Sequence, residues 1–138
     1  MLTGASSAKT CTNYTRYDYL KLLLGQAPRT AFLLEYYDDS KKLFEELETG
    51  VGLGHRLRSR PQYPIIDKES NMVEFEGVIT NIFSSYEGEV RCESLRNLRY
   101  AIAFRPIACR FTPSPGDLVK FNIAFSFRNP IAINVRKM

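Results

Sequence analysis

A change in the spacing of apolar residues at about residue 71 constrains the fold of this chain most strongly. Upstream, apolar side chains recur every three or four residues, which is typical of helices, whereas downstream they alternate with a period of two, which is typical of strands. The downstream runs cover residues 72–83, 89–93, 100–104, 118–123 and 131–135. Five short strands leave no exposed edge when they close on themselves, so the pattern predicts a small β-barrel.

Turn signals separate these predicted strands. Ser84 to Gly88 and Pro113 to Asp117 contain the residue types that favour turns, and Arg128-Asn129-Pro130 precedes the last strand. Gly77 lies inside the first run, where a glycine predicts a bulge or a sharp bend.

The upstream part carries helical signals. Thr15 to Asp18 has capping-box spacing, and Gly25 and Pro28 are expected to end the helix that follows. Pro28 also suits the first turn of a second helical region, whose apolar stripe extends to Leu47 and which Gly50 should end. Asp38-Asp39-Ser40 can recap the chain, so the pattern leaves open whether this region is one bent helix or two.

These observations predict an α+β protein in four parts. Residues 1–11 form a disordered tail, 12–50 a helical segment, 51–70 a linker rich in glycine, arginine and proline, and 71–138 a five-stranded antiparallel barrel. A chain of 138 residues with 44% apolar side chains can bury a core without disulfides or metals.

Basic charge is concentrated in the C-terminal third of the chain. Residues 91–138 carry nine Lys and Arg against two acidic residues, whereas residues 1–55 carry six basic and seven acidic ones. A basic segment of this kind is typical of a phosphate-binding surface, although it also occurs on small domains simply as a solubilising surface.

Residues 73–135 resemble the cold-shock domain, a member of the OB-fold family. Four segments carry the resemblance: Gly77-Val78-Ile79, the Ser85-Tyr86-Glu87-Gly88-Glu89-Val90 stretch, Gly116-Asp117-Leu118-Val119-Lys120-Phe121, and Asn129-Pro130-Ile131-Ala132-Ile133-Asn134-Val135. The resemblance implies an OB-type barrel that binds single-stranded RNA or DNA. The family's stacking aromatics are replaced here by Glu89 and, on the third strand, by Ala101 and Ala103.

The resemblance and the charge pattern together give a set of candidate nucleic-acid-binding residues. Bases would stack on exposed aromatics above a basic groove that follows the backbone. The candidates are Tyr86, Arg91, Arg99, Arg105, Arg110, Phe127 and Arg128. Each has a structural alternative, since Tyr86 can cap the core, Phe127 can pack under the helical segment and the arginines can be solvated.

The sequence predicts a protein that binds rather than catalyses. The single histidine, His55, has no accompanying nucleophile pattern, and the three cysteines lack metal-ligand spacing, so no enzyme activity, metal or cofactor is expected. The leading hypothesis is an RNA-binding accessory subunit of an RNA-processing or RNA-silencing complex. The alternative is a protein-interaction adaptor whose OB barrel and aromatic helices dock partner proteins without direct RNA contact, with Tyr17, Tyr36 and Tyr37 as candidate contacts.

The N-terminus does not resemble a signal peptide, and the longest aliphatic run is too short to span a bilayer. We therefore expect a cytoplasmic or nuclear protein with reduced cysteines and no membrane association. The sequence does not predict an oligomeric state.

Overall fold

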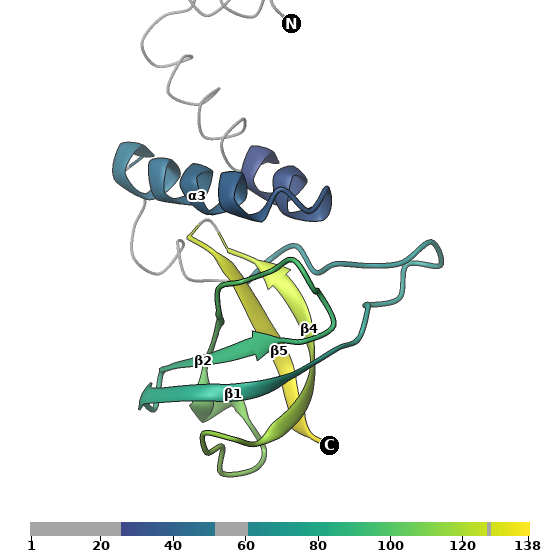
Figure 1. The fold of residues 1–138 in the computed structure, drawn as a ribbon, viewed down its shortest axis with the longest axis vertical. Helices are drawn as coiled ribbons and strands as arrows, with labels where there is room; N and C mark the ends of the chain where they lie inside the picture. Colours follow the sequence, from purple (N-terminus) through teal and green to yellow (C-terminus); the bar gives the residue numbers. More distant parts are fainter. Residues whose placement is uncertain (1–25, 52–60, 127) are drawn as a thin grey trace, which may run out of the picture. The chain divides into compact units, whose positions relative to one another are not determined.

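A computed structural model describes residues 26–51, 61–126 and 128–138 of the chain (Figure 1). It divides the chain into two compact units, Met1–Gly54 and His55–Met138, which are described separately below. Within the described ranges, no helix has both the length and the apolar character that crossing a membrane requires.

In the first unit, two helical stretches meet at a tight corner. Residues 26–33 are helical, the chain turns at Leu34 and Glu35, and α3 then runs over Tyr37–Val51. Glu35 has a φ of 67°, the left-handed conformation that commonly ends a helix. The buried Ser40 hydroxyl donates to the Pro28 carbonyl at 2.7 Å, which ties the two stretches together. The question that the sequence left open is therefore answered by two helices, and Gly50 lies within the second.

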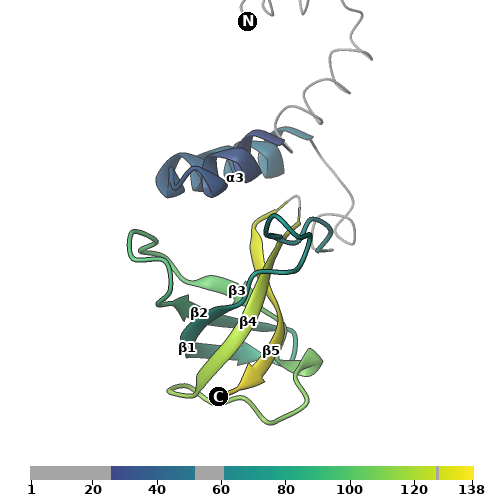
Figure 2. The same ribbon diagram turned by 90° about the vertical axis from the view of Figure 1, so that its right-hand side faces the viewer.

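The second unit is a closed five-stranded barrel, as the periodicity predicted (Figures 1 and 2). Its strands are β1 (Phe75–Ser84), β2 (Glu87–Cys92), β3 (Ile102–Phe104), β4 (Leu118–Phe125) and β5 (Pro130–Lys137), in the spatial order β1-β2-β3-β5-β4. A single-turn 3-10 helix, η1 (Pro106–Ala108), follows β3.

The prediction of a purely antiparallel barrel is wrong at one pairing. β3 and β5 are parallel, with Ala103 opposite Ile131 and Phe104 opposite Ala132, while the other pairs are antiparallel. The reason is topological. β1 is antiparallel to β2 and β2 to β3, so β3 runs in the direction of β1. β1 is also antiparallel to β4 and β4 to β5, so β5 runs in the direction of β1 as well. The pairing of β3 with β5 that closes the barrel is therefore parallel. The α+β class is confirmed.

Alternating side chains from the five strands fill the interior. The largest fully buried ones are Phe104, Phe121 and Phe125, with Ile79, Ile102 and Ile123. Burying a side chain of this size contributes about 1.5–3 kcal/mol, so these six residues supply a large part of the driving force for closing the barrel.

Gly77 is required for close strand approach and not for the bulge that the sequence suggested. A Cβ at this position would lie 2.1 Å from the Arg91 carbonyl oxygen. The register shifts of β1 against β2 occur farther along, between Ile79 and Asn81 and between Ile82 and Ser84. These shifts, two to six residues downstream of Gly77, provide the irregularity that a small barrel needs to curve.

The described part of the predicted linker, residues 61–70, is hydrogen-bonded to the barrel. The Gln62 and Ile65 amides donate to the Phe125 and Ile123 carbonyls at 2.9 and 2.8 Å. This segment therefore pairs with the part of β4 that lies beyond the first residue of β1. It covers backbone groups of β4 that would otherwise be unpaired. A hairpin at residues 66–72 then leads into β1 and projects from the barrel (Figure 1).

Candidate nucleic-acid interface

The turn between β1 and β2 presents an aromatic ring next to a cation. The Tyr86 side chain is 63% exposed, and the Arg105 guanidinium carbon lies 5.5 Å from the centre of its ring. Arg105 directly follows β3 and precedes η1. The Ile107 amide donates to the Ser85 carbonyl at 2.8 Å, so the turn is held against η1 by the backbone. Tyr86 and Arg105 were both predicted from the sequence, and the structure brings them together.

Phe83 is a further exposed aromatic in this region that the sequence analysis did not single out. Its side chain is 59% exposed because the register shift between Ile82 and Ser84 leaves it outside the regular alternation. Ile107, which is also exposed, lies on η1 beside the same turn. The signal available in the sequence was an aromatic directly before a Ser-Ser turn, but Phe83 was counted among the apolar residues of the first predicted strand. We call the group Phe83, Tyr86 and Arg105 the aromatic loop surface.

Next to this surface, a row of three residues crosses the outer face of the barrel. Asn81 on β1 is opposite Glu89 on β2, which is opposite Ala103 on β3. The Asn81 side-chain amide donates to a Glu89 carboxylate oxygen at 3.0 Å. The neighbours of Glu89 along β2, Gly88 and Val90, are buried, so Glu89 points outward as the resemblance implied. This row is polar and carries a negative charge.

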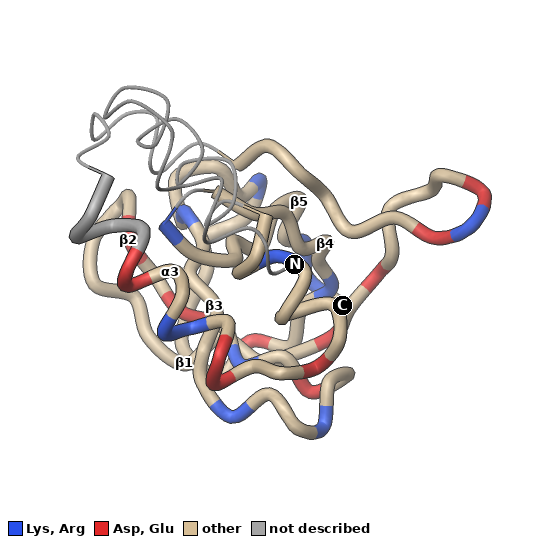
Figure 3. The backbone as a smooth tube through the Cα atoms, turned by 90° about the horizontal axis from the view of Figure 1, so that it is seen from above, with Lys and Arg blue, Asp and Glu red and all other residues tan. Residues whose placement is uncertain are grey.

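The candidate arginines lie on four different segments of the barrel, one strand and three loops. Arg91 is on β2 and pairs with Glu93 at 3.0 Å, so part of its charge is neutralised. The others occupy three loops: Arg99 lies between β2 and β3, Arg105 and Arg110 flank η1 in the long β3–β4 connection, and Arg128 lies between β4 and β5. Figure 3 shows the basic positions of the barrel interspersed with acidic ones.

A buried serine organises the β4–β5 loop. The Ser126 hydroxyl accepts hydrogen bonds from the Arg128 and Asn129 amides at 3.0 and 3.1 Å, and it is within 3.1 Å of the Asn129 carbonyl and side-chain oxygens. Arg128 is half-buried here, and Phe127 lies outside the described residues. Loops at this position are used by OB barrels for ligands.

The three tyrosines predicted as partner contacts differ in position. Tyr17 lies outside the described residues, and Tyr36 is 60% exposed at the helical corner. Tyr37 is only 5% exposed, and its ring packs edge-to-face on Phe32 with the centroids 4.9 Å apart. Its burial places Tyr37 among the packing residues of the helices.

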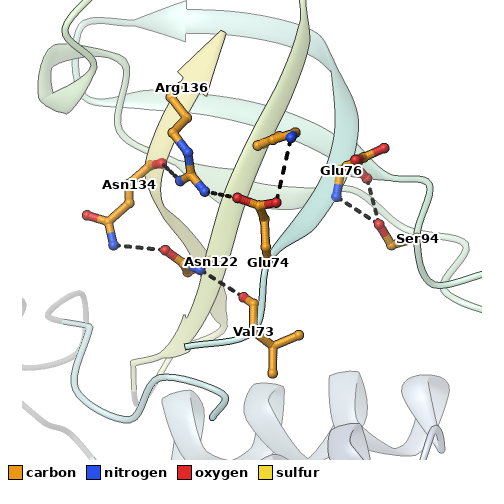
Figure 4. Close-up of polar contacts among 8 residues, drawn as sticks. Val73, Glu74, Glu76, Ser94, Asn122, Asn134 and Arg136 are labelled. Atoms are coloured by element: carbon orange, nitrogen blue, oxygen red, sulfur yellow. Dashed lines mark hydrogen bonds and ion pairs between the residues drawn. The ribbon is translucent and has the colours of Figure 1, made fainter. Parts of the chain in front are cut away.

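A second polar cluster fixes the start of β1 to β4 and β5 (Figure 4). The Glu74 carboxylate pairs with Lys120 on β4 at 3.7 Å and with Arg136 on β5. The buried Asn122 side chain donates to the Val73 carbonyl at 2.8 Å and accepts from Asn134 at 3.0 Å. Through their ion pairs with Glu74, the Lys120 and Arg136 side chains thus help to hold the barrel together.

The described residues contain no group of three or more histidine, cysteine or acidic side chains that could hold a metal ion. Cys92 and Cys109 are free thiols, while Cys11 lies outside the described ranges. Burial raises the pKa of the Cys92 thiol above its ordinary value of 9.0, and burial also raises the pKa of Cys109.

Comparison with known proteins adds little to this description. No family model matches the chain, and no curated protein matches its sequence. Among solved structures, the chain is similar to apo-CusF residues 6–88 from Escherichia coli, with 13% sequence identity and a TM-score of 0.39. That match covers 63% of this chain and 96% of the other.

Proposed function

We propose that this protein binds single-stranded RNA through the aromatic loop surface of its barrel. The observation that carries the proposal is the exposed Tyr86 ring with the Arg105 guanidinium 5.5 Å from its centre. A ring of this kind offers a face on which a base stacks, and the cation beside it can contact the adjoining phosphate. The β1–β2 loop is also one of the two loops through which OB barrels hold oligonucleotides, and the resemblance of the sequence to cold-shock domains supports the same assignment.

The energetics favour a small site. Stacking of one base on an aromatic side chain contributes roughly 1–3 kcal/mol, and Phe83 and Tyr86 provide two such rings. The remainder of the free energy would come from contacts between cations and phosphates, which release counterions and make binding depend on salt. Because the arginines are spread over one strand and three loops, and Arg91 already pairs with Glu93, we expect few phosphate contacts and a shallow salt dependence.

The proposed role is non-catalytic and needs no cofactor. A barrel with a short RNA site suits an accessory subunit that touches RNA within a larger intracellular RNA-processing or RNA-silencing complex. In such an assembly the weak affinity of one short site is raised by attachment to other binding modules.

The test compares variants of the full chain by fluorescence anisotropy with a labelled eight-nucleotide uridine RNA. Tyr86→Ala should weaken binding by about 5- to 150-fold, the equivalent of one lost stacking contact. Arg105→Gln should weaken binding and lower the slope of log K against log salt by about 0.7, because one phosphate contact is lost.

Tyr63→Ala and Arg96→Gln are the matched controls. Tyr63 is an exposed tyrosine beside β4, and Arg96 is an exposed arginine between β2 and β3 that is not among the candidate residues. Both controls should bind like the wild type. The proposal is overturned if the wild type shows no binding at 100 µM protein in low salt, or if the controls lose as much affinity as the Tyr86 and Arg105 variants.

A second candidate function is a protein-interaction adaptor, which the helical corner favours. Leu33, Leu34 and Tyr36, which lie within four residues at this corner, are each more than half exposed. Exposed apolar groups of this kind are common at interface centres. Partners that stay bound after nuclease treatment, and are lost with Leu34→Ser and Tyr36→Ser but kept by Tyr86→Ala, would favour the adaptor over the RNA-binding module.

A further inference from the structure

The acidic residue beside the aromatic loop surface is difficult to reconcile with simple backbone binding. Glu89 lies on the outer face of β2, three residues from Tyr86, where a carboxylate would repel phosphate groups. Its partner on β3 is Ala103, whose side chain is small and uncharged. A carboxylate that belongs to an RNA site must therefore face the base edges rather than the phosphates.

The carboxylate is also held in position. Asn81 donates to one Glu89 oxygen at 3.0 Å, and the Thr80 hydroxyl donates to the Glu89 backbone carbonyl at 3.2 Å. This support limits the rotamers available to Glu89, so less conformational entropy is lost when a ligand binds. Within the described residues, no ion pair joins Glu89 to a cation, in contrast to Glu93, which pairs with Arg91 at 3.0 Å.

We infer that Glu89 selects guanine at the base position next to Tyr86, an inference that rests on the proposed RNA-binding function. An ionised carboxylate only accepts hydrogen bonds, so it recognises base edges that present donors. The Watson–Crick edge of guanine presents two adjacent donors, N1–H and the N2 amine, which match the two carboxylate oxygens. Adenine and cytosine present one amine next to a ring acceptor, and uracil presents one donor between two carbonyls, so each brings an acceptor against the carboxylate.

The experiment isolates one hydrogen bond by comparing guanine with hypoxanthine. Two labelled eight-nucleotide uridine RNAs are used, one with a single central guanosine and one with inosine, which keeps N1–H but lacks the N2 amine. The full-length wild type should bind the guanosine RNA on the order of tenfold more tightly. Glu89→Gln should bring this ratio close to one, because a glutamine side chain offers a single acceptor oxygen.

Glu93→Gln is the matched control, since it removes the same charge directly after the end of β2, at a residue already paired with Arg91. It should keep the guanosine preference of the wild type, while any general gain in affinity from the lost negative charge should appear in both variants. Equal binding of the two RNAs by the wild type, or a preference that survives in Glu89→Gln, overturns the assignment of Glu89. Failure of the wild type to bind either RNA instead refutes the proposed function itself.

Discussion

Replacement of Gly77 by alanine should disrupt the barrel at the contact between β1 and β2. The added Cβ would lie 2.1 Å from the Arg91 carbonyl oxygen, 3.0 Å from its carbonyl carbon and 3.2 Å from the Cys92 Cα. All three are backbone atoms of the paired strand, so no side chain can turn away to make room. The carbonyl oxygen must withdraw by more than 1 Å to reach ordinary contact distance.

The expected loss follows from this displacement. Overpacking a core usually costs 1–3 kcal/mol, and here the backbone of a hydrogen-bonded strand pair must move, so we expect about 3 kcal/mol or more. A domain of this size has a free energy of unfolding of roughly 5–15 kcal/mol, so the variant should lose a large fraction of its stability.

Gly116→Ala is the matched control for the loss of a glycine. Gly116 has a φ of 96°, and an added Cβ there meets no atom within 4 Å, so only backbone strain of about 1–2 kcal/mol is expected. The assay is a urea titration of the full chain followed by the NMR signals of Val90 and Val119, which are buried in the barrel and report on it separately from the helices. A Gly77→Ala variant that is no less stable than Gly116→Ala would refute the argument from close approach.

Two further predictions concern the barrel. Stability should fall as pH rises above about 9, because the folded-state pKa of Cys92 is raised by burial and the unfolded chain releases this proton first. Cys92→Ala should flatten that part of the profile in urea titrations at successive pH values, and an unchanged slope would show that Cys92 is not responsible. Ser126→Ala should cost about 1–2 kcal/mol and increase amide hydrogen exchange at Arg128 and Asn129, since its hydroxyl accepts from both amides. Unchanged exchange at these two amides would mean that the loop is ordered without the serine.

The strand pattern was readable from the sequence because alternation is a local property. Each of the five predicted runs contains or overlaps a strand of the barrel. The turn signal at Ser84–Gly88 spans the turn from β1 to β2, and Pro113–Asp117 lies between β3 and β4. The resemblance to the cold-shock domain placed Glu89 and Ala103 at outward positions, and the alternating burial along β2 and β3 agrees with this. These predictions succeeded because a strand with one face toward a core imposes its period on its own residues.

The direction of β5 against β3, the role of Gly77 and the exposure of Phe83 were decided only by tertiary structure. Each depends on contacts between residues far apart in the chain, such as the Gly77 position against the Arg91 carbonyl. The arrangement of the basic side chains in space likewise depends on tertiary structure. The sequence determined that the C-terminal third is basic, but the fold placed its arginines on separate segments and brought Arg105 to Tyr86, because the barrel closure and not the order of residues sets which side chains meet.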